Sequence, residues 1–534
     1  MTSLLVWIFV GLGVLLRAAG LHRPLLGNFS AYQTGQAMMA QFFAKDFSSI
    51  FYPQVYILAG RKPGVTLLYY PVSALIASFL YRVFGHGLDV WGRLQAVLFF
   101  LASCIYLYRL LRRWLNQELA LISVVAFSLS PLTIIYGQSF QNEMATVFFT
   151  LSFLLHMDRF LKKFSRVDFL FSSLSLSLVL LTRPNCIYVV LLPFYKLLKG
   201  DYGREESGRK WKGFFVASAL GFVLPVAWFS YTWFLSKSQA AHVYSSVFAQ
   251  LQVKSSLMST QLFNFDYFKK LVDLLAGNAL SPIGLTLLIV GAITALSMWG
   301  QGGIFMIWCA AYLITSFLLT PRKIVEHEFY LLQFVLPACP LIGIGFQQLL
   351  KAFEDRKAFQ KVFVFFFVAV TTIVSFRYAL HPAFKTSDRE LNFIEIGNEI
   401  HKITSREKSK IIVQGNHTLL YYADRFGWGM EVNKKDELQE YQKFMLPAEE
   451  WKRKKAASKN PIANLEYLRQ DGATHFVVSD PGEYLQSQEF AQYMSAHYPV
   501  VAQKQNVFII YDLSSALSAP APAPASSTPQ TDSF

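Results

Sequence analysis

The chain is divided into long apolar stretches joined by short polar segments, and this division constrains its fold more than any other feature. Hydrophobic residues make up 53% of the 534 residues and charged residues only 16%, which excludes an ordinary soluble globular protein of this length. A helix needs about 20 apolar residues to cross a bilayer. The sequence therefore predicts a polytopic α-helical membrane protein.

About eleven stretches are predicted as membrane spans. They lie near residues 3–20, 88–108, 119–136, 144–158, 168–182, 184–197, 214–235, 281–299, 303–320, 329–350 and 361–379. Basic residues gather in every second connecting segment, as at Arg112, Lys162 and Lys199, and cytoplasmic loops carry such an excess of Lys and Arg. We therefore expect the N-terminus and the basic loops on the cytoplasmic side and the alternate loops on the outer face.

The same charge pattern limits the partners of the chain. The net charge of +15 comes from short basic clusters between apolar stretches, so it indicates membrane lipids rather than nucleic acid as the partner. The four cysteines all lie inside apolar stretches without CxxC spacing, which indicates neither a disulfide framework nor a zinc site.

Three parts are expected along the chain. A membrane domain covers residues 1–379 and includes a long first outer loop, residues 21–87, with two helices expected along the membrane surface at 30–43 and 66–85. Residues 380–513 are polar and contain strand-like runs at 410–415, 474–480 and 507–513, which predict an α/β domain on the outer face. The Pro, Ala and Ser composition of residues 514–534 predicts a disordered tail.

Polar and charged side chains gather in four outer segments. These segments are expected to converge on the same side of the membrane. The candidates for a site are Asn28, Tyr32, Arg61, Lys62, Gln138, Asn142, Glu143, Arg183, Arg322, Lys323, His327 and Tyr330. Because a charge at membrane depth is costly, Arg183 is expected to have an anionic partner.

One carboxylate with several cations suits the transfer of a group from a lipid phosphate. Glu143 would accept the proton of an attacking hydroxyl, while Arg, Lys and His side chains would neutralise the departing phosphate. Each residue also has a simpler interpretation. Glu143 is also explained as a helix N-terminal charge, Arg61 and Lys62 as contacts to lipid headgroups, and His327 as part of a solvated cluster with Glu326 and Glu328.

Three segments carry a resemblance to a known family. They are RKPGVTLLYYPVSALIASFLYRVFG, GLDVWGRLQAVLFFLASCIYLYRLLRRW and SPLTIIYGQSFQNEM, and HEFYLLQFVLP adds a fourth similarity. In their order and spacing they resemble the GT-C superfamily of integral-membrane glycosyltransferases, particularly the bacterial branch with lipid A aminoarabinose transferases and the related protein O-mannosyltransferases. The resemblance covers about residues 1–350.

The resemblance implies a function and roles for single residues. It implies transfer of a sugar, with inversion, from a polyprenyl-phosphate donor to a lipid, glycan or protein acceptor at the periplasmic face of a bacterial inner membrane. Glu143 corresponds to the second-loop acid of the family and Lys62 to the cation that holds the lipid phosphate. Asn28 stands where the family usually has a first-loop Asp, and an amide is no general base at neutral pH.

Asn28 therefore leaves several hypotheses open. Glu143 takes over the role of base, another group such as Asp46 does so, or the protein is a catalytically degenerate sugar-lipid binding or envelope-assembly protein. A transporter ranks last, because the polar groups gather at outer helix ends rather than near span midplanes. No outer loop contains a DxD pair, so we expect no cofactor, with a divalent metal ion as the open alternative.

Overall fold

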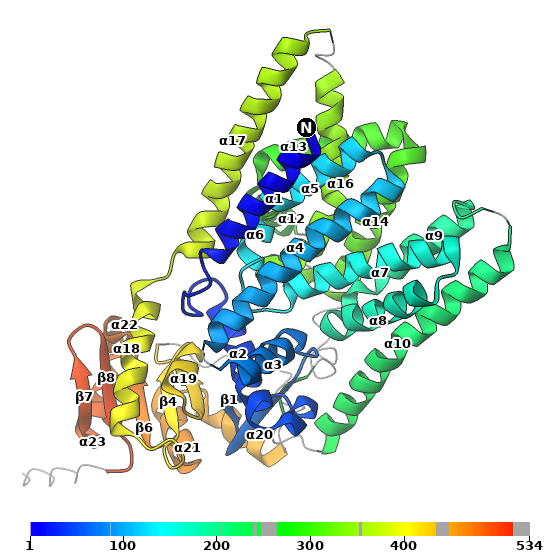
Figure 1. Cartoon of the computed structure of the whole chain (residues 1–534). Helices are drawn as coiled ribbons and strands as arrows, with labels where there is room; N and C mark the ends of the chain where they lie inside the picture. Colours follow the sequence, from blue (N-terminus) through cyan, green and yellow to red (C-terminus); the bar gives the residue numbers. More distant parts are fainter. Residues whose placement is uncertain are drawn as a thin grey trace, which may run out of the picture. The chain divides into compact units, whose positions relative to one another are not determined.

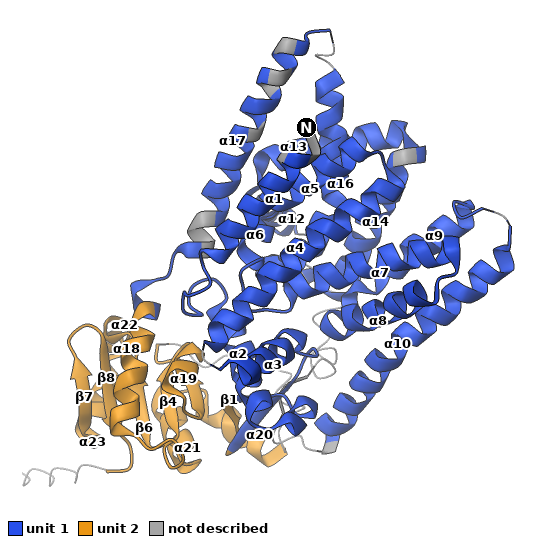
Figure 2. Cartoon of the chain, in the orientation of Figure 1, with its two compact units in different colours: residues 1–55, 62–390, 440–447 blue, residues 56–61, 391–439, 448–534 orange. Residues whose placement is uncertain are grey.

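The computed structural model divides into two compact units (Figure 2). The described residues are 2–85, 87–203, 205–238, 243–246, 264–351, 355–433 and 448–515. Within them, the first unit comprises residues 2–55 and 62–390, and the second comprises residues 56–61, 391–433 and 448–515.

The first unit is a bundle of helices that coincide with the apolar stretches of the sequence (Figure 1). Its long helices are α1 (Thr2–Ala18), α4 (Leu88–Trp114), α7 (Glu143–Lys163), α8 (Arg166–Thr182), α10 (Ser207–Ser238), α13 (Ser281–Ser297), α14 (Trp299–Leu319), α16 (Leu332–Lys351) and α17 (Lys357–Phe384). In the described ranges, α4, α7, α10, α14 and the run 328–351 are long and apolar enough to cross a bilayer. A sixth span results if α12 (Phe265–Leu274) with η6 (Leu275–Ala279) is joined to α13 across a 110° bend. The chain is thus a multi-pass membrane protein, while the number of eleven spans stays a prediction.

Two expected surface helices are present in the first loop, with one difference. Helix α2 (Ser30–Lys45) covers the first of them, but α3 (Val72–Phe84) begins six residues later than the expected start at residue 66. Residues 62–67 instead form strand β2 (Lys62–Leu67), which pairs in parallel with β3 (Val243–Ser246). The reason is Pro71, which disfavours the helical conformation in the residue before it and occupies the N-cap of α3.

The third apolar stretch is broken into α5 (Gln117–Leu129) and α6 (Pro131–Tyr136). Pro131 cannot continue the hydrogen-bond pattern of α5. Arg17 of α1, whose side chain is fully buried, compensates for this break. Its guanidinium donates to the carbonyls of Thr133 at 3.0 Å and Ser128 at 3.1 Å and lies 3.6 Å from the ring centre of Phe100. A buried cation therefore joins α1 to the broken helix.

The second unit is a sheet covered by helices. Its strands are β1 (Gln54–Ala59), β4 (Ile411–Gln414), β5 (Gly427–Met430), β6 (His475–Val478), β7 (Val500–Lys504) and β8 (Phe508–Asp512), and its order is β1-β5-β4-β6-β8-β7. The first four positions are parallel, and β8 and β7 are antiparallel. Its helices include α18 (Asp388–Ile403), α20 (Ala448–Ala457), α21 (Pro461–Gln470) and α23 (Gln488–His497).

The division of the chain differs in detail from the expected one. Strands β4, β6 and β8 lie in the three strand-like runs of the sequence, but α17 extends to Phe384 and the second unit begins at Leu391 rather than at residue 380. Residues 56–61 of the first loop also belong to the second unit. The tail that the sequence predicts to be disordered lies, from residue 516, outside the described residues.

Helices α13 and α16 cross at Gly291 and Gly345, and this close crossing can be tested. A Cβ on Gly291 would overlap the backbone carbonyl of Leu341, whereas a Cβ on Gly11 of α1 would meet no atom within 4 Å. We expect Gly291→Ala to destabilise the protein by about 1–3 kcal/mol, because α13 and α16 must separate. The matched Gly11→Ala should leave stability unchanged or raise it by up to about 1 kcal/mol. Thermal unfolding of the purified variants in detergent measures both, and equal melting temperatures would contradict the close crossing.

Candidate active site

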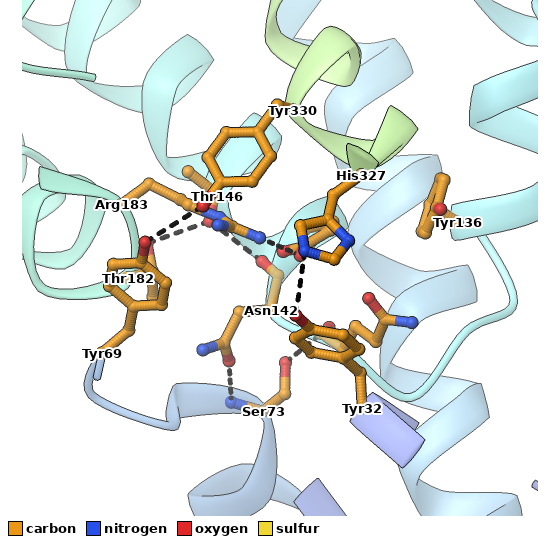
Figure 3. A network of polar contacts seen from close by, with 12 residues as sticks. Tyr32, Tyr69, Ser73, Tyr136, Asn142, Thr146, Thr182, Arg183, His327 and Tyr330 are labelled. Carbon is orange, nitrogen blue, oxygen red and sulfur yellow. Dashed lines mark hydrogen bonds and ion pairs between the residues drawn. The ribbon is translucent and has the colours of Figure 1, made fainter. Parts of the chain in front are cut away.

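The centre of the candidate site is a buried ion pair. Glu143 is the first residue of α7 and Arg183 follows the last residue of α8, and their exposed fractions are only 6% and 8%. The Arg183 guanidinium donates to Glu143 Oε1, and Figure 3 shows Arg183 with its neighbours Tyr69 and Tyr330. Glu143 is therefore the anionic partner that the sequence predicts for Arg183.

Aromatic rings enclose the cation of this pair. The guanidinium carbon of Arg183 lies 5.0 Å from the ring centre of Tyr69, 4.8 Å from that of Phe329 and 4.6 Å from that of Tyr330. The hydroxyls of Tyr69 and Tyr330 are 3.2 Å apart. Such cation–π contacts strengthen when they are desolvated. The arrangement fixes Tyr330, a predicted site residue, directly beside Arg183.

A small pocket adjoins the ion pair. Glu143, Arg183, Asn185 and Gln333 are among its lining residues, and it has room for about one water molecule. Glu143 Oε2 is buried and has no hydrogen-bond partner among the described residues. One carboxylate oxygen of Glu143 thus accepts from the Arg183 guanidinium, while the other can still accept a hydrogen bond.

The second loop, residues 137–142, is held in place by hydrogen bonds to the backbone of the first loop. The side-chain oxygen of Asn142 accepts from the Ser73 amide at 2.9 Å, and its nitrogen donates to the Tyr70 carbonyl at 3.1 Å. The Ser73 hydroxyl donates to the carbonyl of Gln141 at 2.9 Å. Asn142 therefore positions the start of α7 and, in this structure, uses both ends of its amide to do so.

Gln138 is buried at the other end of the second loop. Its side chain donates to the Ile134 carbonyl at 3.4 Å, and its own carbonyl accepts from Arg93 of α4 at 2.9 Å. Arg93 also donates to the carbonyls of Arg23 and Pro24, so it joins the first loop to the second. The candidate residues chosen from the sequence do not include Arg93. The available signal was an Arg near the start of an apolar span.

His327 lies with Tyr32 beside the ion pair. The Tyr32 hydroxyl is 3.4 Å from His327 Nε2, and the imidazole stacks on Phe329 with ring centres 5.2 Å apart. Burial lowers the pKa of His327 to about 4, so the ring is uncharged at neutral pH. His327 is therefore available for hydrogen bonding, and its expected role in neutralising a departing phosphate stays a prediction.

Glu328 is a carboxylate that sequence reasoning missed. It begins η7 (Glu328–Leu331), is buried, and accepts hydrogen bonds from Asn28 at 3.1 Å, from Tyr136 at 3.3 Å and from Asn278. The interpretation of residues 326–328 as a solvated charge cluster is therefore wrong for Glu328. The pattern EHE is typical of a surface, and the signal in favour of burial was the apolar run that follows directly.

The remaining cations and one further carboxylate lie at exposed positions. Lys62 is exposed at the start of β2, and Lys323 pairs with Glu326 at 3.6 Å. Arg61 belongs to the second unit, where it contacts Asp471 at 3.3 Å and the Gln470 carbonyl at 3.0 Å. Asp46 is exposed, and both of its carboxylate oxygens accept hydrogen bonds from Ser48. The side chain of Arg322 lies outside the described part of the chain.

The described side chains contain no group that resembles a metal centre. Within the ranges given above, no three His, Cys, Asp or Glu residues lie together in a way that would hold a metal ion. The residues that the structure does bring together are Asn28, Tyr32, Tyr69, Tyr136, Asn142, Glu143, Arg183, His327, Glu328 and Tyr330. They come from the first loop, the second loop, the end of α8 and the segment before α16.

Comparisons with known proteins add a family match over part of the chain and a shared fold. Residues 62–229 match the family described as dolichyl-phosphate-mannose-protein mannosyltransferase. No match to the sequence was found among curated proteins.

Several solved structures share the fold at low sequence identity. ArnT from Cupriavidus metallidurans bound to undecaprenyl phosphate is 16% identical, over 96% of this chain and 98% of that one, with a TM-score of 0.64. The oligosaccharyltransferase AglB from Archaeoglobus fulgidus, in complex with an inhibitory peptide and a dolichol-phosphate, is 9% identical over 94% and 74%, with a TM-score of 0.53. The arabinofuranosyltransferase AftD from Mycobacteria is 12% identical over 96% and 40%, with a TM-score of 0.55.

These similarities extend over nearly the whole chain, and they agree with the family match over residues 62–229. They confirm the fold that the resemblance implies. The chain thus shares its fold with these glycosyltransferases, and its match to a mannosyltransferase family covers residues 62–229.

Proposed function

We propose that this protein is an inner-membrane glycosyltransferase that moves a sugar from a polyprenyl-phosphate carrier to a lipid, glycan or protein acceptor at the periplasmic face, with inversion. The observation that carries the proposal is the buried polar cluster around Glu143, Arg183 and Glu328 at the ends of membrane helices. Two structures of the same fold hold polyprenyl phosphates, undecaprenyl phosphate in ArnT and dolichol-phosphate in AglB.

The transfer of the sugar requires a proton acceptor and positive charge near the leaving phosphate. An acceptor hydroxyl attacks the anomeric carbon, its proton goes to a carboxylate, and the polyprenyl phosphate leaves with the electron pair. The leaving phosphate gains negative charge, so donors and cations fixed in advance stabilise the transition state most. We assign Lys62 to the donor phosphate, because its ammonium is exposed and free to reach a lipid headgroup.

Arg183 has a different role in this proposal. Its charge is already balanced by Glu143, and three aromatic rings surround it. We infer that the pair fixes the wall formed by Tyr69 and Tyr330, against which the sugar would bind. No dedicated cofactor is part of the proposal.

One observation favours the second candidate function, a catalytically degenerate sugar-lipid binding or assembly protein. Asn28 replaces the expected first-loop acid, and the second-loop acid Glu143 is engaged with Arg183. The deciding experiment is transfer by the purified protein in lipid vesicles, from radiolabelled undecaprenyl-phosphate sugars to a membrane extract of its host. Labelled acceptor supports the enzyme, whereas donor binding without transfer across several sugars contradicts it.

The ion pair yields a prediction that separates its contribution to stability from its contribution to sugar transfer. Glu143→Gln should lower the melting temperature and transfer together, because it leaves the buried Arg183 unpaired, a loss of about 3–5 kcal/mol. Glu143→Gln/Arg183→Met removes both charges and should regain most of the stability, since a buried pair is often replaceable by apolar groups. We expect transfer to stay at least about 10-fold below wild type in the double variant. Recovery of transfer along with stability would show that the pair is only a scaffold.

The role of Lys62 yields a second prediction. Lys62→Gln should weaken binding of undecaprenyl phosphate about 10-fold, because one charge-assisted contact to phosphate is lost, and should leave the melting temperature unchanged. Titration of the reconstituted protein with undecaprenyl phosphate at two salt concentrations measures this. The matched control is Lys402→Gln, an exposed lysine of α18 in the second unit that pairs with Glu399. Equal affinities for the two variants would remove Lys62 from the donor site.

A further inference from the structure

Asn28 is hydrogen-bonded to a carboxylate on another element of the first unit. Its side-chain nitrogen donates to Glu328 Oε1 at 3.1 Å, and Gln33 of α2 holds the backbone at that point by donating to the Asn28 carbonyl at 3.1 Å. The first-loop position where the resemblance predicts an acid thus faces an acid that η7 supplies. The negative charge expected in this part of the site is present, but on a different residue.

Glu328 differs from Glu143 in the charge of its partners. Glu143 is paired with a guanidinium, whereas the donors to Glu328 are the amides of Asn28 and Asn278 and the phenol of Tyr136, all of them neutral. Among the described side chains, no cation lies within 4 Å of Glu328. The charge of Glu143 is thus balanced by a guanidinium, whereas Glu328 is held by neutral donors.

The hydrogen bonds of Glu328 also leave part of its capacity to accept hydrogen bonds unused. A carboxylate accepts at about four lone-pair sites. Two donors, Asn28 and Tyr136, reach Oε1, and one donor, Asn278, reaches Oε2. One acceptor site on Oε2 therefore remains, while the three donors fix the orientation of the group.

We propose that Glu328 is the general base of the reaction, in the place of the first-loop acid that Asn28 replaces. The inference rests on the glycosyltransferase function proposed above. The O–H bond of the acceptor breaks and its proton moves to Oε2 of Glu328. The acceptor oxygen forms the new bond to the anomeric carbon, and the bond from that carbon to the phosphate oxygen breaks, with its electron pair leaving on the polyprenyl phosphate.

This assignment explains why the first-loop residue is an amide. An aspartate at position 28 would place a second carboxylate at hydrogen-bond distance from Glu328, and two such like charges cannot both stay ionised. Asn28 instead donates a hydrogen bond and orients the base. The proton acceptor has in effect moved from the first loop to the segment before α16.

The test compares Glu328→Gln with Asn28→Asp/Glu328→Gln in the transfer assay. Glu328→Gln should lose about 100-fold or more in turnover and still bind undecaprenyl phosphate as wild type does. The double variant returns the carboxylate to the first loop, opposite an amide at position 328, and should regain at least about 10-fold over Glu328→Gln. Asp46→Asn, which changes the single carboxylate of the first loop, residues 21–87, should keep the turnover of wild type.

The pH profile distinguishes a base from a structural group. In wild type and in the double variant, kcat/KM should rise with pH as the carboxylate loses its proton, and the residual activity of Glu328→Gln should lack this rise. Wild-type turnover in Glu328→Gln, or loss of donor binding in parallel with turnover, would overturn the assignment. If Glu328→Gln does not fold, the double variant and the wild-type pH profile test the assignment. A double variant that folds but transfers no sugar would contradict Glu328 as the general base. A wild type that transfers no sugar would refute the proposed function itself.

Discussion

A charge removed from water must find a partner, and this constraint decides how the helices of the first unit meet. Arg183 and Glu143 are both buried, so the end of α8 has to lie against the start of α7 for their charges to balance. Arg17 is buried without a carboxylate within 4 Å among the described residues, and it uses backbone carbonyls around the break between α5 and α6 instead. In both cases a single guanidinium fixes the relative position of two helices.

The site is built from the interruptions of the helices rather than from their regular turns. Pro131 starts the short α6, which ends at Tyr136, and Pro184 starts η2 (Pro184–Val190) directly after Arg183. The segment η7 (Glu328–Leu331) is a short 3-10 turn before α16. Non-helical backbone at membrane depth is tolerated only where protein or water satisfies its polar groups. These breaks in the helices leave backbone polar groups that need hydrogen-bond partners. They also bring Tyr136, Arg183 and Glu328 close together.

The sequence predicted the helices well because each depends on a local property. An apolar stretch of sufficient length favours a helix, and for that reason most of the predicted stretches coincide with observed helices, although the stretch 119–136 is broken at Pro131. Strand β2 was missed because its pairing with β3 joins residues far apart in the sequence. The membership of residues 56–61 in the second unit was missed for the same reason.

For the candidate site, the sequence by itself determined that an arginine at position 183 needs an anionic partner and that Asn28 is no base. Those conclusions follow from the chemistry of single side chains. Only the tertiary structure decided that Glu143 is that partner, that His327 is uncharged at neutral pH, and that Glu328 is buried against Asn28. Burial and pairing depend on which helix ends meet, and no local pattern of residues contains that information.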